Sequence, residues 1–262
     1  MTTTPPIIIS SPVRRSGTTL LQRLLTSAPN TLIYGESCAN DFQMFTNFYL
    51  AKQLQLAASK NWRNEQLDSV LEGNVNDWIP DLMPNIDEYL EDMKKSFLQF
   101  FNSYPNFAKQ KNRTNWGMKL PEWNPTNLKL IEQFFPNFKI IYITRNLEDC
   151  VRSAKKVEMV KGINEVNQYC QIWKMHKDTA TQQNFKPENT MYISYESFVE
   201  NPQPILTNLE KFTGAKGIDA SVMNFKFNKF KETTEENETF GEYVSPAELT
   251  DEELEMVKKY SA

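Results

Sequence analysis

The sequence predicts an α/β protein in which a mainly parallel β-sheet is flanked by helices. Short apolar runs rich in β-branched residues, such as Phe138–Thr144, alternate with segments whose apolar residues recur at helical spacing. Positively charged residues follow several of these runs, although the net charge of the protein is -4. Because ligands of parallel sheets bind beyond the carboxyl ends of the strands, the pattern also predicts a site for a polyanion at that edge.

The first predicted element is a strand, turn and helix within Ile7–Leu25, read as IIISSPVRRSGTTLLQRLL. Such a turn directs backbone N–H groups and the positive end of a helix dipole toward one spot, which suits a phosphate or a sulfate. Gly17 would let the backbone approach the anion, and Arg15 would add a positive charge. The alternative is an ordinary strand-to-helix turn in an α/β core.

A second strand is predicted at Thr31–Tyr34, and Gly35-Glu36-Ser37 follows it. We expect a helix over Ala39–Ser59, most of whose aromatic residues belong to the core, while any that face a cleft would line an acceptor pocket: Phe42, Phe45, Phe48 and Tyr49. Residues Asn61–Tyr104 continue as helices broken near Pro80 and Pro84, without a recognisable chemical motif. We therefore expect a helical insertion at about 39–110 within a single domain, 1–262.

The rest of the chain returns to strand and helix alternation. We expect strands that end at Lys119, at Thr144 just before Arg145, and at Ser194 just before Tyr195. The predicted strands span Asn115–Lys119, Phe138–Thr144 and Asn189–Ser194, and the predicted helices span Pro125–Phe135, Leu147–Val157, Asn164–Gln183 and Pro204–Phe212.

Composition restricts the function classes. The protein has 262 residues, of which 40% are hydrophobic and 24% charged, as is typical of a soluble globular protein. An acidic balance argues against a nucleic-acid binder. Three cysteines without Cys-x-x-Cys spacing and a single histidine, His176, argue against a disulfide framework and a metal site. No secretion signal or membrane span is evident, so we expect a cytoplasmic protein.

These motifs resemble those of sulfotransferases that use 3′-phosphoadenosine 5′-phosphosulfate (PAPS), and they are closest to the tyrosylprotein branch. Arg15–Leu20 reproduces the Arg-Ser-Gly-Thr-Thr-Leu motif of that family. Arg145 and Ser153 fit its 3′-phosphate motif, with Phe135–Lys139 as the preceding stretch. Tyr195-Glu196, followed by Asn201-Pro202, is similar to a further segment. The resemblance covers 7–35 and 115–214 and implies a fold like that of P-loop NTPases.

The resemblance also implies roles for individual residues. The 5′-phosphosulfate would be bound by Arg15 and the backbone of the turn, a set that comprises Arg14, Arg15, Ser16, Gly17, Thr18, Thr19 and Leu20. Arg145 and Ser153 would bind the 3′-phosphate, and Lys119 would contact the leaving-group oxygens. Tyr195 would help to hold the nucleotide, or is simply a core tyrosine. Glu36, within Gly-Glu, would be the general base, or is a helix N-terminal glutamate stabilised by the dipole.

The reaction implied is transfer of the sulfuryl group to an acceptor hydroxyl without a metal, with release of adenosine 3′,5′-bisphosphate (PAP). We expect a small metabolite or natural-product alcohol as acceptor, as in bacterial tailoring sulfotransferases such as those that sulfate cyanobacterial toxins. The alternatives are protein tyrosine, which the absence of a membrane anchor makes less favoured, and a carbohydrate.

Two other classes remain as rivals. A P-loop kinase would need Gly-x-x-x-x-Gly-Lys-Ser/Thr, which is missing, and an acid where Thr144-Arg145 stands. A non-catalytic module that binds an anionic nucleotide would require Glu36 and Lys119 to be dispensable. The family's basic loop near the C-terminus is also missing, and Lys226, Lys229 or Lys231 would have to replace it.

Overall fold

A computed structural model describes residues 4–58, 60–76, 82–183, 185–225 and 247–261. The chain divides into two compact units, one made of Met1–Asn40 with Pro105–Ala262 and the other of Asp41–Tyr104. The single-domain organisation stays a prediction. Lys226, Lys229 and Lys231, named as substitutes for the basic loop, lie outside the described residues, as does Pro80.

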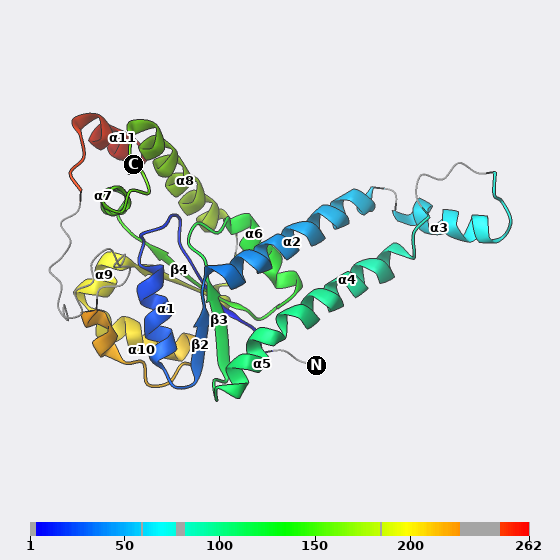
Figure 1. Cartoon of the computed structure of the whole chain (residues 1–262), viewed down its shortest axis with the longest axis horizontal. Helices are drawn as coiled ribbons and strands as arrows, with labels where there is room; N and C mark the ends of the chain where they lie inside the picture. The colour runs from blue at the N-terminus through cyan, green and yellow to red at the C-terminus, as the bar shows by residue number, and fades with distance from the viewer. Residues whose placement is uncertain (1–3, 59, 77–81, 184, 226–246, 262) are drawn as a thin grey trace, which may run out of the picture. The chain divides into compact units, whose positions relative to one another are not determined.

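The first unit contains a five-stranded parallel sheet with the strand order β2-β3-β1-β4-β5 (Figure 1). Its strands are β1 (Ile7–Ser10), β2 (Thr31–Tyr34), β3 (Asn115–Lys119), β4 (Lys139–Thr144) and β5 (Thr190–Ser194). Every residue of β1 is buried, as expected for the central strand of a sheet covered on both faces. The predicted α/β fold class is confirmed.

Helices cover both faces of this sheet (Figure 1). They are α1 (Thr18–Ser27), α6 (Pro125–Leu130), α7 (Leu147–Lys156), α8 (Ile163–Gln182), α9 (Tyr195–Glu200) and α10 (Pro202–Thr213), whereas α11 (Asp251–Ser261) packs on α7 and α8. One apolar cluster joins Leu21, Leu24 and Leu25 of α1 to β1, β4 and α10. Another joins α7, α8 and α11 around Val151 and Trp173.

The predicted helices differ from the observed ones in a few places. The helix expected over Pro125–Phe135 ends at Leu130, and a short 3-10 helix spans Ile131–Gln133 because the Phe134 amide bonds the carbonyl three residues back. Helices α9 and α11 were not expected, whereas the short α5 (Ser103–Gln110) lies within the helical stretch expected at about 39–110. None of the described helices is long and apolar enough to cross a membrane.

The second unit is helical and contains α3 (Lys60–Leu71), α4 (Ile86–Phe101) and most of α2 (Glu36–Ala57). The aromatic rings of α2 pack against those of α4, with Phe42 and Phe97 at a centroid distance of 4.9 Å and Phe42 and Phe101 at 4.8 Å. Early residues of α2 meet late residues of α4, so the two helices run antiparallel. Helix α2 begins at Glu36, three residues earlier than expected.

Candidate functional site

The turn between β1 and α1 has a backbone suited to an anion. Arg15 and Gly17 both have positive φ angles, 67° and 99°, on either side of Ser16. Alternation of this kind turns successive N–H groups toward one concavity, the arrangement called a nest. Gly17 is the N-cap of α1 and no side chain caps that helix, so a ligand has access to its first amides.

Gly17 also has a packing role that the sequence did not reveal. A Cβ atom on Gly17 would lie 2.5 Å from Cδ2 of Tyr195, which is too close for any side chain. The Tyr195 ring is covered in turn by the Arg145 guanidinium, whose Cζ is 4.5 Å from the ring centroid. The turn, the end of β5 and the end of β4 therefore meet at Gly17 and Tyr195.

Arg15, Arg145 and Ser153 form one cluster. Arg15 Nε donates to Ser153 Oγ at 3.0 Å, and Arg145 Nη1 donates to the Arg15 carbonyl at 3.1 Å. Arg145 Nε is buried and has no hydrogen-bond partner among the described residues. Burial lowers the pKa of Arg15, and the nearby Arg145 charge adds to that effect. Two adjacent cations with an unsatisfied buried donor are a suitable site for a phosphate.

Lys119, Glu36 and Thr19 form the other polar cluster. Lys119 ends β3, Glu36 begins α2 directly after β2, and these two parallel strands pair with each other. Lys119 is only 6% exposed, and its Nζ lies 2.5 Å from Glu36 Oε1 and 3.5 Å from Thr19 Oγ1. A buried cation, a carboxylate whose side chain is 43% exposed and a helix-start hydroxyl are therefore in contact.

The remaining predicted residues contribute less through their side chains. Ser16 is fully buried, and its hydroxyl donates to the Val13 carbonyl at 2.9 Å, so that hydroxyl already has a partner within the turn. Leu20 packs against the core cluster beside α1. The Arg14 side chain is exposed and lies 3.5 Å from the carboxylate of Glu122. The binding roles assigned to these residues stay predictions.

Sequence reasoning missed the face of α8 that supports the turn. Tyr169 Oη donates to the Arg14 carbonyl at 2.6 Å, and Trp173 Nε1 donates to the Arg145 carbonyl at 3.3 Å. His176 Nδ1 lies 2.9 Å from the Pro12 carbonyl, so this nitrogen carries the proton. The His176 side chain is buried beneath the turn. Spacing of four and then three residues was the available signal, because it places all three rings on one helix face.

Glu122 and Cys150 were also missed. Besides its ion pair with the Arg14 guanidinium, Glu122 accepts from the Arg14 amide at 3.3 Å. Cys150 Sγ lies 3.6 Å from Ser16 Oγ beneath the turn, and burial raises the pKa of this thiol to about 12, which keeps it neutral. Both contacts join residues more than 100 positions apart, so no local sequence pattern predicts them.

In the described part of the chain, no three His, Cys, Asp or Glu residues gather as metal ligands would.

Comparison with known proteins identifies a family over most of the chain. Residues 5–219 match the model of a family described as "Sulfotransferase family". The structure is similar to the sulfotransferase domain from the curacin biosynthetic pathway, with 18% identity, a TM-score of 0.52, and coverage of 85% of this chain and 78% of that one. No curated protein sequence matches this chain.

Two further solved structures have a similar fold. The sulfotransferase domain of the Synechococcus PCC 7002 olefin synthase is 15% identical, with a TM-score of 0.55 and coverage of 99% of this chain and 95% of that one. A sulfotransferase from Mycobacterium tuberculosis is 14% identical, with a TM-score of 0.50 and coverage of 100% and 77%. At these identities the likeness concerns the fold alone.

Proposed function

The chain belongs to the sulfotransferase family and is a sulfotransferase, and from that premise we propose that PAPS is its donor and a small-molecule hydroxyl its acceptor. PAPS supplies an activated sulfuryl group, and the products are a sulfate ester and PAP. The proposal requires one site for each phosphate of the nucleotide, a cation at the leaving group and a base near the acceptor.

The two polar clusters fit the two ends of PAPS. The uncapped start of α1 and the backbone of Ser16–Thr19 suit the 5′-phosphosulfate, because N–H donors and the helix dipole both favour an anion. The orphaned Nε of Arg145 and the hydroxyl of Ser153 suit the 3′-phosphate. Arg15, which bonds both of these residues, would lie between the two phosphates.

Lys119 and Glu36 suit the transfer step. The acceptor oxygen forms a bond to sulfur while the bond between sulfur and the 5′-phosphate oxygen breaks, so negative charge grows on the departing phosphate. A lysine ammonium has three N–H donors. Lys119 therefore keeps its hydrogen bonds to Glu36 and Thr19 and donates its third N–H to the departing 5′-phosphate oxygen. Glu36, whose carboxylate contacts Lys119, would accept the acceptor's proton.

The observation that carries this proposal is the contact of Lys119 Nζ with both Glu36 Oε1 and Thr19 Oγ1. It links the proposed base, the proposed electrophilic cation and the start of the anion-binding helix in one connected group. A module that only binds nucleotides has no need of a carboxylate beside the lysine.

A natural-product or metabolite acceptor is supported by two similar structures, whose names place them in the curacin pathway and in an olefin synthase. Protein tyrosine and carbohydrate remain alternatives, and the closeness to the tyrosylprotein branch stays a prediction, as do the cytoplasmic location and the metal-free reaction.

An acceptor screen with PAPS tests the proposal. The purified full chain is incubated with PAPS and panels of phenols, aliphatic alcohols, sugars and tyrosine peptides, with EDTA present, and PAP release is measured. We expect release with at least one small alcohol or phenol. Tight PAP binding without release on any panel would instead support the non-catalytic module, and release only with peptides or sugars would overturn the acceptor class.

A further inference from the structure

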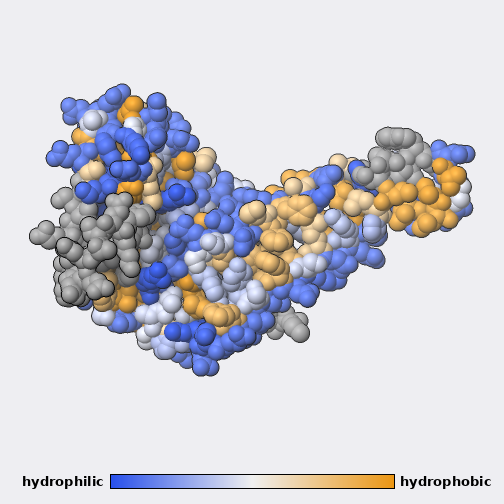
Figure 2. All heavy atoms as spheres, in the orientation of Figure 1, coloured by the Kyte–Doolittle hydropathy of each residue, from blue (hydrophilic) through white to orange (hydrophobic). Residues whose placement is uncertain are grey.

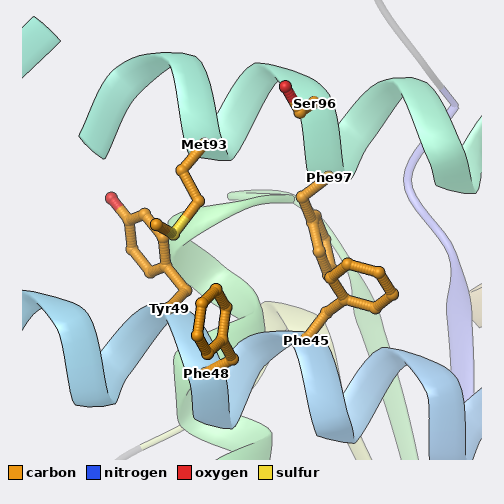
Figure 3. Close-up of a pocket in the computed structure, with 6 residues that line it drawn as sticks. All are labelled: Phe45, Phe48, Tyr49, Met93, Ser96 and Phe97. Carbon is orange, nitrogen blue, oxygen red and sulfur yellow. The ribbon is translucent and has the colours of Figure 1, made fainter. Parts of the chain in front are cut away.

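The helical unit contains a cavity of about 130 Å³ between α2 and α4. Figure 3 shows Phe45, Phe48 and Tyr49 extending from α2, and Met93 and Phe97 extending toward them from α4. Ser96 completes the lining, with its hydroxyl directed away from α2 (Figure 3). All six residues lie in one compact unit.

The lining follows from two matched helix patterns. Positions 45, 48 and 49 of α2 and positions 93, 96 and 97 of α4 have the same spacing of three and then one, which places each trio on one helix face. Toward one end of the cavity the rings close tightly, since Phe42, Phe97 and Phe101 are at most 3% exposed. At the cavity itself Met93 stands opposite two aromatic rings, and their shapes do not fill the space.

The cavity is apolar and open to the outside. The Tyr49 hydroxyl accepts a hydrogen bond from Gln53 Nε2 at 3.3 Å, so it has a partner on its own helix. Phe45 is 39% exposed and Phe48 is 53% exposed. Figure 2 shows hydrophobic residues exposed along the surface of this helical unit. Large exposed rings at the mouth of an apolar space are unfavourable in water unless a ligand covers them.

Size and lining together define the occupant. A closed apolar cavity of about 150 Å³ accepts benzene, and the space between α2 and α4 has a similar volume and an apolar lining but is open at its mouth. Aromatic rings and a methionine thioether also favour an aromatic guest through edge contacts. We propose that the cavity between α2 and α4 binds a small apolar group, of the size of a benzene ring or a short alkyl chain.

The group has two possible sources, the acceptor itself or a separate apolar molecule. Three of the six lining residues belong to α2, the helix whose first residue is the proposed base Glu36. The assignment to the acceptor rests on the proposed function, whereas binding of the apolar group does not.

Toluene is the probe for binding. Saturation-transfer NMR on the full chain measures toluene affinity in the wild type, in Met93→Trp, which fills the cavity, and in Met44→Trp. Met44 is a matched control because it is also a methionine of this unit, is 69% exposed and does not line the cavity. We expect saturable binding that Met93→Trp weakens at least tenfold and Met44→Trp leaves unchanged. Equal toluene binding in both variants, or none in the wild type, would overturn the proposal.

A second variant keeps the test valid if Met93→Trp does not fold, as judged by circular dichroism. Met93→Ala enlarges the cavity, so we expect naphthalene to bind at least tenfold more tightly than it binds the wild type. Unchanged naphthalene affinity in Met93→Ala would contradict the proposal.

Steady-state kinetics then identify the source. If the acceptor supplies the group, Met93→Trp raises KM for an aryl alcohol and leaves the affinity for PAP unchanged. If a separate ligand supplies it, Met93→Trp loses toluene binding while KM for every active acceptor stays the same. Absence of turnover with any acceptor refutes the proposed function, and the toluene result still decides the cavity.

Discussion

Two strand–turn–helix units of this protein have the same topology, but only one of their helices is capped by a side chain. Strands β1 and β4 pair in parallel, and each leads through a short turn into a helix, α1 or α7. Helix α7 is capped by its own residues, because the Asn146 side chain accepts from the amides of Glu148 and Asp149. Helix α1 has a glycine N-cap, no side-chain cap and no acid in its first turn.

This difference indicates two ways of binding an anion within one fold. At α1 the backbone amides and the dipole are left to the ligand, which suits the phosphate end where charge develops during the reaction. At α7 the amides already have partners, so a phosphate there depends on the side chains of Arg145 and Ser153. Substitutions at the α1 turn are therefore expected to weaken the site proposed for the 5′-phosphosulfate, and substitutions of Arg145 or Ser153 the site proposed for the 3′-phosphate.

The largest effect is expected for Glu36→Gln. This change removes the proposed base and keeps the shape of the side chain, so kcat should fall by about 10²- to 10⁴-fold while PAP affinity is kept. Initial rates of PAP release and calorimetric titration with PAP measure the two quantities. The matched control is Glu148→Gln, a glutamate in the first turn of α7, which should keep full turnover. A Glu36→Gln enzyme as active as the wild type would remove Glu36 as the base.

A smaller effect is expected for Gly17→Ala. The added Cβ would lie 2.5 Å from the Tyr195 ring and force a φ of 99° on alanine, and such backbone strain costs about 1–3 kcal/mol. PAP affinity should fall about tenfold or more, because 1.4 kcal/mol corresponds to a factor of ten. Gly162→Ala is the control, since nothing lies within 4 Å of its added Cβ. If both variants bound PAP like the wild type, the special backbone of the α1 turn would not matter for binding.

The smallest effect is expected for Asn146→Ala. Loss of the α7 cap should lower the free energy of unfolding by about 1 kcal/mol and leave kcat nearly unchanged, because this cap serves the helix and not the ligand. Urea denaturation measures the stability change, with Asn85→Ala as the matched control, since Asn85 caps α4 in the same manner. A loss of turnover comparable to that of Glu36→Gln would contradict the separation of the two helix starts.

The sequence was sufficient to predict the sheet and the edge where the polar residues gather. Buried strands of a parallel sheet are continuous apolar runs, and their carboxyl ends meet at one edge regardless of the packing. Lys119 with Glu36, and Arg145 with Arg15, are therefore brought together as strand-end residues. The structure places them in contact, while their roles in binding and catalysis stay proposals.

The contacts that fix the turn could not be predicted in the same way. Tyr169, Trp173 and His176 have helical spacing, but the surrounding sequence does not predict which backbone carbonyls their side chains bond. The pairing of Glu122 with Arg14 and the fit of Gly17 against Tyr195 depend on tertiary packing between distant segments. The cavity between α2 and α4 depends on side-chain shapes, and the aromatic spacing alone fits a filled core equally well.

We assign the 5′-phosphate end of the nucleotide to the start of α1 and the 3′-phosphate to the side chains beside α7. The affinities of Arg145→Ala for PAP and for adenosine 5′-monophosphate, which lacks the 3′-phosphate, test this assignment most directly. Arg23→Ala, an exposed arginine of α1, is the control. Removing a charged donor from a phosphate costs about 1.5–3 kcal/mol, so PAP affinity should fall about 10- to 100-fold while that for the monophosphate changes little. Equal losses for the two nucleotides would contradict the assignment of the 3′-phosphate to Arg145.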